Sequence, residues 1–295
     1  MTDFFCSSEL HLIAGESPLT FTHVNNFDSP KNHQLHINNY IEVYVYISGD
    51  ADYIVGDSYY SLKKGDIIVI NPQEVHKVVL KSECQYERFY MLIPTNAFDK
   101  FVFNPLSEIL NRSPGNPTLV SLVSDKRKNA LEILYKTSEL CNGGLDENTQ
   151  MMAYSLIIRF LCLLNSNLNS LSDGSAKKSY IPKLLSEVLV YINQNLPFIQ
   201  SLSEIAEHFD VTPPYLSTLF KKHIGTSIKI YIRTQRVALA KKLLNEGFSV
   251  TDACYESGFN DCSYFIKHFK QCMGITPLQY KIQTGISEKL NTERK

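Results

Sequence analysis

The sequence predicts an α+β protein in which a β-rich N-terminal domain with a pair of helices precedes an all-α C-terminal domain. Three observations lead to this fold class: strand-like runs over residues 10–95, helical leucine spacing over residues 96–165, and nearly continuous helical patterning over residues 181–280. The 295 residues, of which 44% are hydrophobic, are enough for two packed domains of ordinary size.

The β-rich region is defined first by Ile41–Ile47, a run of β-branched and aromatic residues. A hairpin is expected where Tyr53–Val55 and Tyr59–Leu62 flank a Gly-Asp turn. Further strands are expected at Ile67–Ile70 and Phe89–Ile93. Short strands divided by such turns are typical of an antiparallel sandwich or a small barrel.

A helix pair is expected next, in residues 96–165. The first helix is indicated by leucines at helical spacing and is expected to end at a Gly-Gly pair; the leucines are Leu122, Leu131, Leu134 and Leu140. The apolar faces of the pair must cover either the sheet or a partner subunit. The polar residues 166–180 predict a linker. The expected organisation is therefore a domain over 1–165, a second domain over 181–284, and a polar tail over 285–295.

The second domain contains an internal repeat. Ser201-Leu202-Ser203-Glu204 is similar to Ser249-Val250-Thr251-Asp252 at an offset of 48, and further matches at an offset of 49 pair Tyr215, Phe220 and Gly225 with Tyr264, Phe269 and Gly274. In each copy a Ser or Thr/Asp precedes a helix and a Gly follows it, which are cap signals. Each copy therefore predicts a helix, a short turn and a second helix, the arrangement that places a reading helix in a DNA major groove.

Residues 227–245 separate the two copies and predict one amphipathic helix. Its apolar side opposes a basic side made of Lys229, Arg233, Arg236, Lys241 and Lys242. A rigid spacer of about 19 residues at about 1.5 Å per residue would hold the two reading helices roughly one DNA turn apart.

Charge is distributed unevenly. Residues 181–295 carry 14 Lys+Arg and 10 Asp+Glu, whereas residues 1–180 carry 15 and 20, so only the C-terminal part is expected to meet a polyanion such as double-stranded DNA. The seven cysteines are scattered without a Cys-x-x-Cys pair, which favours reduced thiols in the cytoplasm. Neither a signal peptide nor a membrane span is expected.

Residues 181–280 resemble the DNA-binding domain of the AraC/XylS family of bacterial regulators. The resemblance rests on Tyr215–Lys222 with Gly225, on Arg236–Leu244, and on Gly258–Phe265 with Phe269-Lys270, Gly274, Thr276-Pro277 and Tyr280. It implies DNA contacts from the first reading helix by Pro214, Ser217, Thr218 and Lys221, and from the second by Cys262, Ser263, Ile266 and Lys267. The residues that it places in the core are Leu216, Leu219, Phe220, Phe265 and Phe269.

Residues 30–90 resemble the cupin-like β-barrel that binds the effector in many of these regulators. Cupin enzymes hold a metal with three His and one Glu, and His36, Glu42 and His76 match that pattern, but Asn38 stands where the second His belongs. Because Asn is a poor ligand for transition metals, neither a metal nor another cofactor is expected. His23 and His33 are expected to be surface residues.

Strand alternation places Glu42, Tyr44 and Tyr46 on one face of Ile41–Ile47, and the resemblance turns that face into the barrel. Together with His36, His76 and Arg88 these residues form the expected effector site, which suits a polar small molecule such as a sugar.

The resemblance implies a homodimeric, cytoplasmic transcription regulator that answers to this effector and works with RNA polymerase, not an enzyme. An activator is expected, but repression stays open, because both use the same DNA contacts and differ only in operator position. Two alternatives stay open. One is a metal-dependent cupin enzyme with an accessory DNA-binding module, which lacks a full ligand set because of Asn38. The other is a DNA-repair protein, which would need a methyl-accepting cysteine in a zinc cluster that these dispersed cysteines do not provide.

Overall fold

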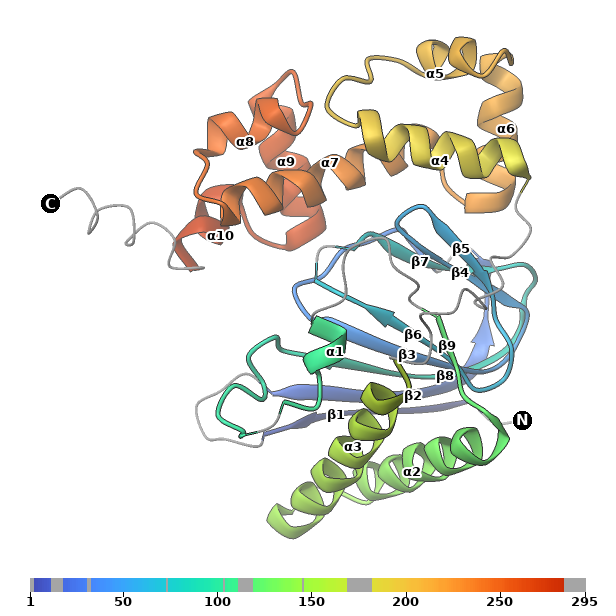
Figure 1. Ribbon diagram of the computed structural model, residues 1–295, viewed down its shortest axis with the longest axis vertical. Coiled ribbons are helices and arrows are strands. Elements are labelled where there is room, and N and C mark those ends of the chain that lie inside the picture. Colours follow the sequence, from blue (N-terminus) through green and yellow to red (C-terminus); the bar gives the residue numbers. More distant parts are fainter. Residues whose placement is uncertain are drawn as a thin grey trace, which may run out of the picture.

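The computed structural model describes residues 3–11, 18–30, 33–72, 74–102, 104–110, 119–144, 146–168 and 182–283. A β-rich N-terminal part with helices on its far side supports a helical C-terminal part (Figure 1). The predicted α+β class, with this order of parts, is confirmed. The expected tail 285–295 and residues 169–181 of the linker region lie outside the described residues.

The described strands form two antiparallel sheets that face each other. The larger has the order β1-β2-β8-β3-β6-β9, namely β1 (Phe4–Leu10), β2 (Leu19–Asp28), β8 (Cys84–Ile93), β3 (Ile41–Ser48), β6 (Asp66–Ile70) and β9 (Leu119–Ser121). The smaller has the order β5-β4-β7, namely β5 (Ser58–Ser61), β4 (Ala51–Val55) and β7 (His76–Leu80). The hairpin expected around the Gly-Asp turn is the β4–β5 pair.

Strand β3 shows why the β domain has two separate cores. Its Val43 and Val45 side chains join the core beneath the helices, whereas Tyr44 and Tyr46 join an aromatic core between the two sheets. Alternating side chains point to opposite faces of a strand, and here both faces are covered, so seven consecutive residues of β3 are buried.

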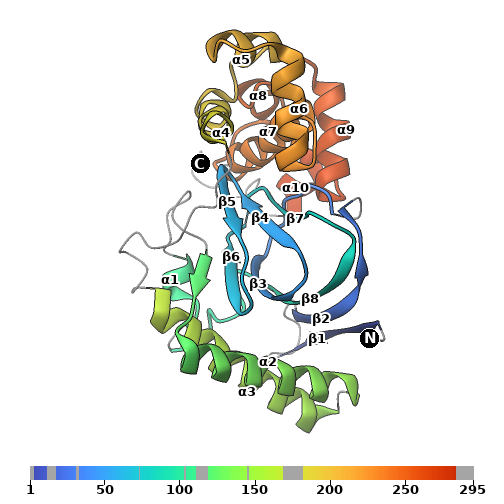
Figure 2. The same cartoon turned by 90° about the vertical axis from the view of Figure 1, so that its right-hand side faces the viewer.

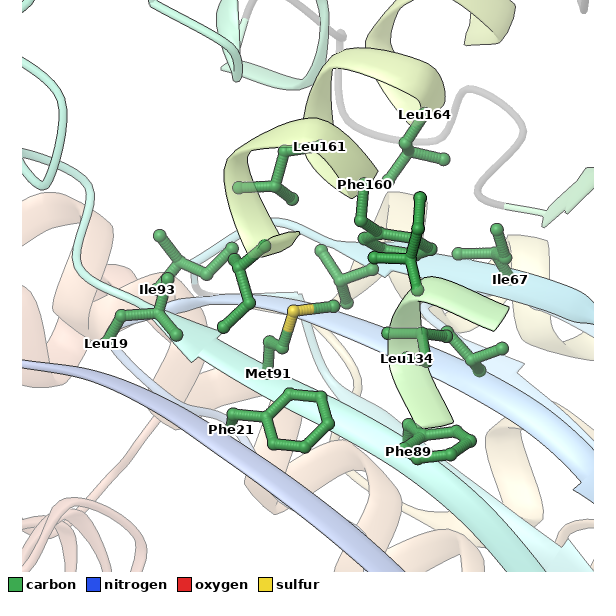
Figure 3. Close-up of a cluster of buried hydrophobic side chains, with 14 of the residues drawn as sticks. Leu19, Phe21, Ile67, Phe89, Met91, Ile93, Leu134, Phe160, Leu161 and Leu164 are labelled. Carbon is green, nitrogen blue, oxygen red and sulfur yellow. The ribbon is translucent and has the colours of Figure 1, made fainter. Parts of the chain in front are cut away.

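Helices α1 (Ser107–Leu110), α2 (Ser124–Asn142) and α3 (Glu147–Leu168) cover the outer face of the larger sheet. Figure 3 shows Leu134 of α2 and Phe160 and Leu161 of α3 packed on side chains of the sheet, among them Phe89 and Met91. The apolar faces of the helix pair therefore cover the sheet, which was one of the two possibilities left open by the sequence.

The C-terminal part consists of seven described helices. They are α4 (Lys183–Asn195), α5 (Leu202–His208), α6 (Pro213–Ile224), α7 (Ile228–Asn245), α8 (Val250–Glu256), α9 (Cys262–Met273) and α10 (Pro277–Gln283). Helices α5 and α6 form the first helix-turn-helix copy, α8 and α9 form the second, and α7 joins them. Among the described residues, the structure contains no helix with the length and apolar character needed to cross a membrane.

The outer face of the smaller sheet packs against the C-terminal part. Ile54, Tyr59 and Val79 of this sheet share a core with helices α4 to α7. Three hydrogen bonds to backbone carbonyls cross the same boundary: Lys77 Nζ to Gly225 O at 2.9 Å, Tyr231 Oη to Gly56 O at 2.8 Å, and Lys241 Nζ to Asn38 O at 3.1 Å. The four layers are thus helices, large sheet, small sheet and the helix-turn-helix domain (Figure 2).

Several expectations need correction. Strand β1 begins at Phe4, ahead of the expected strands, and β9 lies within the region expected to be helical. Leu122 follows β9 and precedes α2, so it packs in the core from a connecting segment and not from a helix. Helix α3 continues to Leu168, three residues past the expected end of the first domain at residue 165. In each case a tertiary contact extends or adds an element that local patterning does not mark.

Candidate DNA interface and ligand pocket

The two reading helices, α6 and α9, start and stop in the same way. The Thr212 side chain accepts a hydrogen bond from Tyr215 N at 3.4 Å, and the Asp261 side chain accepts one from Tyr264 N at 2.7 Å. Both helices end at a glycine in the left-handed region, with φ of 68° and 76°. These caps satisfy helix ends that would otherwise expose unpaired backbone groups, and they fix which side chains each helix presents.

The predicted DNA contacts lie on the outer faces of α6 and α9. Six of the eight side chains are exposed and two are half-buried; the exposed ones are Pro214, Thr218, Lys221, Ser263, Ile266 and Lys267, and the half-buried ones are Ser217 and Cys262. The residues expected in the core are inside, since Leu216, Phe220, Phe265 and Phe269 are fully buried and Leu219 is partly buried. An exposed polar face over an aromatic core is what a groove-reading helix requires.

Helix α7 sets the distance between the copies. Its 18 residues span roughly 27 Å at about 1.5 Å per residue, against roughly 34 Å for a DNA turn. The helices α6 and α9 lie toward opposite ends of α7 in Figure 1 and on the same side of it in Figure 2. Two adjacent major grooves on one face of DNA present this arrangement.

The basic side expected for α7 is only partly on the surface. Lys241 is 1% exposed, because the loop before β3 packs over it and its ammonium donates to Asn38 O. Arg236 donates to Leu196 O at 3.1 Å and to Ile199 O, which ties α7 to the segment before α5. The basic side predicted for this helix is therefore interrupted by one buried lysine, Lys241, and one half-buried arginine, Arg236.

A cavity of about 510 Å³ opens beside β3 in the β domain. It is lined by His33, Gln34, His36, Asn38, Glu42, Tyr44, Tyr53, Val78, Arg88, Tyr90 and Leu92. The volume falls within the range of small-molecule sites, roughly 300–1,000 Å³, and polar groups are mixed with aromatic rings along the wall. Four of the six residues expected to bind the effector line it: His36, Glu42, Tyr44 and Arg88.

The other two expected effector residues are placed differently. His76 lies just behind Glu42, completely buried and bonded to it, so it touches the site through that carboxylate. Tyr46 shares the inward face of β3, but the strand carries it past the cavity, where its hydroxyl donates to Gly49 O at 2.5 Å. A two-residue period predicts the face but not how far along the strand a cavity extends.

Glu42 is the centre of the polar network in the pocket. Its carboxylate is 7% exposed, accepts from Asn38 Nδ2 at 3.0 Å and from the Tyr53 hydroxyl at 3.4 Å, and lies 3.1 Å from His76 Nε2. Burial disfavours the ionised form of Glu42, but the charge and hydrogen bond of His76 outweigh burial and hold the pKa of Glu42 below its usual value. The same carboxylate raises the pKa of His76 above its usual value against the effect of burial.

Arg88 provides a cationic group in the same pocket, from strand β8 next to β3. Its guanidinium stacks on the Tyr86 ring at 4.4 Å, and its Nη1 lies 3.6 Å from Asp28 Oδ2. Within the described residues, that buried Nη1 has no hydrogen-bond partner. A buried donor without an acceptor is costly, so this atom is well placed to bond an oxygen of a bound molecule.

Two histidines expected at the surface take other positions. His33 lines the cavity and pairs with Asp28 at 2.9 Å, and His23 is buried, bonded to Ser138 at 2.8 Å and to Glu87 at 3.1 Å. Together with Tyr53 and Gln34, His33 was missed as a pocket residue. The alternation of β4 could have indicated Tyr53, whereas nothing in the sequence marks the path of the loop that carries His33 and Gln34.

The residues that match the cupin metal pattern do come together. One potential ligand atom from each of His36, Glu42 and His76 lies within 4.8 Å of the others. Asn38 is beside them, but its amide nitrogen donates to the Glu42 carboxylate and its side-chain oxygen accepts from Tyr40 N, so both ends of the amide are already hydrogen-bonded. The group thus contains three ligand side chains, not four.

The duplicated helix-turn-helix and the pocket-bearing β domain define a DNA-binding regulator with a ligand-binding domain. Residues 205–283 match the family model described as "Helix-turn-helix domain", and residues 28–117 match the "AraC-like ligand binding domain". The chain belongs to the AraC family of helix-turn-helix transcriptional regulators.

Three curated relatives illustrate the match. The chain is 35% identical to the HTH-type transcriptional activator AarP of Providencia stuartii, over 38% of this chain and 84% of that protein. It is 24% identical to the HTH-type transcriptional regulator YfiF of Bacillus subtilis, over 83% and 78%. It is 21% identical to the melibiose operon regulatory protein of Escherichia coli K12, over 83% and 82%. These relatives are regulators of transcription, as the sequence resemblance implied.

Proposed function

We propose that this regulator binds two successive major grooves upstream of its target promoters and answers to a small polar effector held in the β domain. The observation that carries the DNA part is the placement of α6 and α9 on one side of a roughly 27 Å spacer, with Thr218, Lys221 and Lys267 exposed. Ser and Thr hydroxyls bond several bases, and Lys bonds guanine or phosphate.

The effector is a sugar or a related metabolite. Glu42 accepts hydrogen bonds from hydroxyl groups, and the Asn38 amide can donate to hydroxyl or carboxylate oxygens. Nη1 of Arg88, which has no hydrogen-bond partner among the described residues, can donate to the same oxygens, and Tyr44 and Tyr53 offer flat apolar surfaces. The melibiose operon regulatory protein among the relatives is named for a sugar operon, which supports the same class.

Asn38 connects this pocket to the DNA-binding domain. Its side chain donates to Glu42 in the pocket, and its carbonyl accepts from Lys241 of α7 at 3.1 Å. The neighbouring Ile37 packs in the same core as Val237 and Ala240 of α7. An effector that displaces Asn38 from Glu42 therefore changes a contact of the helix that spaces the two copies, which is the differential interaction that a two-state response needs.

The remaining parts of the proposal concern partners. We infer a homodimer formed through α2 and α3, whose outer surface exposes Met151 and Met152 at 63% and 52%. The regulator acts as an activator that works with RNA polymerase in the cytoplasm, and it is not an enzyme. The alternative, a metal-dependent enzyme with an accessory DNA-binding module, is favoured only by the His36, Glu42 and His76 group.

The DNA part is tested by genome-wide binding of the full chain beside the double variant Lys221→Ala/Lys267→Ala. Sharp peaks are expected for the unchanged chain, containing two half-sites about 10–10.5 base pairs apart, and the double variant should lose them. Lys183→Ala, which removes an exposed lysine on α4, is the matched control and should keep every peak. Identical peaks for all three chains would contradict the assignment of α6 and α9.

The effector part is tested at a promoter found in that experiment. Metabolites of the neighbouring operon are screened for a change in transcription, and Glu42→Ala and Arg88→Leu should remove the response while DNA affinity stays within about twofold. Glu187→Ala, which removes an exposed carboxylate on α4, is the control. A normal response in both pocket variants would show that the effector binds elsewhere.

A further inference from the structure

Two histidines are held together at the polar end of the ligand pocket by the backbone itself. His36 N donates to His76 O at 3.1 Å, and His76 N donates to His36 O at 3.0 Å, so the two residues form an antiparallel bridge outside the named strands. Their rings lie 4.2 Å apart between centroids, at a steep angle. Residues in such a bridge have adjacent side chains, and Glu42 of β3 approaches the same point.

Each imidazole ring is oriented by a backbone carbonyl. His36 Nδ1 lies 2.9 Å from Gln34 O, and His76 Nδ1 lies 2.8 Å from Glu74 O. A carbonyl oxygen only accepts hydrogen bonds, so both Nδ1 atoms carry a proton. In a neutral ring of this tautomer, Nε2 is the nitrogen that can bind a metal ion, and both rings have it available. A hydrogen bond from the other ring nitrogen to a backbone carbonyl is common in histidines that bind metals.

The contact between His76 and Glu42 calls for a cation. His76 Nε2 lies 3.1 Å from Glu42 Oε2 in a place where His76 is 0% exposed and Glu42 is 7% exposed. With the ring proton on Nδ1, a neutral His76 would direct its lone pair at a carboxylate lone pair. Either a second proton on the ring or a metal ion bound to both atoms removes that repulsion.

The position of His36 distinguishes these two solutions. A proton between His76 and Glu42 makes no use of a third ligand, yet a potential ligand atom of His36 is within 4.8 Å of both partners. Ligands at 2.0–2.2 Å from a tetrahedral Zn²⁺ lie roughly 3.5 Å apart, so the three atoms need to close by only about 1 Å. His36 is exposed on the loop before β3, so a ring shift of this size displaces few neighbouring side chains.

We propose that His36, Glu42 and His76 bind one divalent first-row transition-metal ion at the polar end of the effector pocket. Two imidazole nitrogens and one carboxylate suit Zn²⁺, Co²⁺, Ni²⁺ or Fe²⁺. Asn38 and Tyr53 donate to the carboxylate and fix its orientation, as outer partners of metal ligands do.

A three-ligand site leaves coordination positions open toward the cavity. Hydroxyl and carboxylate oxygens of a polyhydroxy compound or a hydroxy acid would occupy them, with Arg88 in the same pocket as a second anchor. This part rests on the proposed function, because it takes the cavity to be the effector site. It narrows the effector class from polar molecules in general to those that can chelate a metal ion.

The test uses the full chain, without a polyhistidine tag, after treatment with a chelator. Titration with Co²⁺ and Zn²⁺ is followed by visible absorption and calorimetry, and one equivalent should bind, with the d–d bands of a four- or five-coordinate Co²⁺ ion. His36→Gln removes a ligand from an exposed position, so it should fold and weaken binding by more than roughly 100-fold, since even loss of an outer partner costs 10–100-fold. Glu42→Gln should do the same.

His208→Gln is the matched control, because His208 is an exposed histidine on α5, outside the pocket. It should leave affinity and stoichiometry unchanged. Absence of bound metal, or equal binding by His36→Gln and the unchanged chain, would overturn the metal site. If the chelated chain still binds its operators and takes up no metal, the metal site fails and the regulator stands. Loss of operator binding with and without metal would instead contradict the proposed function.

Discussion

The two helix-turn-helix copies share a local design but differ in what surrounds them. Gly225 and Gly274 end α6 and α9 in the same left-handed conformation. A Cβ on Gly225 would lie 2.8 Å from Lys77 Nζ of the β domain, whereas a Cβ on Gly274 would meet no described atom within 4 Å. The same sequence signals thus build a reading helix tied to the ligand domain in one copy and an open one in the other.

This difference indicates how a ligand could act on DNA binding. Lys77 follows His76 on β7, so adjacent side chains of one strand face the pocket and the end of α6. The first copy is bonded to the sheet beside the pocket through Lys77, whereas the second copy shares an apolar core with α7 and with Ile37 and Val75 of the β domain. An effector is therefore expected to act on the orientation of the first copy more than on that of the second.

The largest effect expected concerns what the copies share. Phe220→Ala and Phe269→Ala each remove a fully buried ring at equivalent positions, and each should cost about 3–5 kcal/mol of unfolding free energy. Urea unfolding of the full chain, followed by the circular dichroism signal of its helices, measures the unfolding free energy of each variant. If the two losses of unfolding free energy differ by less than about 1 kcal/mol, the aromatic cores of the two copies contribute equally to stability. If either variant unfolds like the unchanged chain, that copy is not built around its aromatic core.

A smaller effect separates the copies in DNA binding. Lys267→Ala and Lys221→Ala should each weaken operator binding by about 1–3 kcal/mol if the lysine contacts a base edge. If the lysine contacts a phosphate instead, the variant should show a weaker dependence of operator affinity on salt concentration. Lys221 also lines a crevice of about 550 Å³ shared with Lys77 and Tyr59 of the β domain, so its loss should depend on the effector. Titration with operator DNA, with and without effector, measures the affinity of each variant. If the effector changed the loss of affinity for Lys267→Ala alone, the second copy and not the first would be the one that responds to the effector.

The sequence is sufficient for the features that depend on neighbouring residues. Ser201, Thr212, Ser249 and Asp261 each mark a helix start through a side chain that accepts from a backbone N–H three residues on. The alternation of β3 puts Glu42 and Tyr44 on one face, and that face lies inside the β domain, as the family resemblance implied. These features follow from chain geometry over two to four residues, which a single sequence displays.

Features that depend on distant partners could not be predicted. Strand β9 is three residues long and exists because it pairs with β6, about 50 residues earlier. Lys241 continues a basic pattern on α7, and only the docked loop at Asn38 makes it a buried residue. His33 lines the pocket from the segment between β2 and β3, where its ring pairs with Asp28 at the end of β2. Burial by another domain has no periodic signal along the chain.

The glycine pair offers a matched test of the tie to the β domain. Alanine at either position is strained by roughly 1 kcal/mol, because an L side chain disfavours the left-handed region. Only Gly225→Ala also presses on Lys77 Nζ and weakens its bond to Gly225 O, worth about another 1 kcal/mol. Hydrogen exchange should then rise in α6 and β7 for Gly225→Ala alone. Equal exchange in both variants would show that Lys77 does not hold the first copy.

The smallest effect expected is a pH dependence at the tie of α7 to the pocket loop. Burial lowers the pKa of Lys241 to about 8, while the unfolded chain keeps a value near 10.4. Below pH 8 both states are protonated, and between these values the unfolded state holds more protons, so stability rises with pH. From pH 7.5 to 8.5 the gain is about 0.7 kcal/mol. Lys241→Met fills the same space without a titrating group and should lose that gain, as measured by the difference between the two unfolding curves at each pH.

A parallel rise in stability with pH in both chains would assign the effect to another group, such as Lys77, whose pKa burial also lowers. The tie of the first copy, and not that of α7, would then carry the pH dependence.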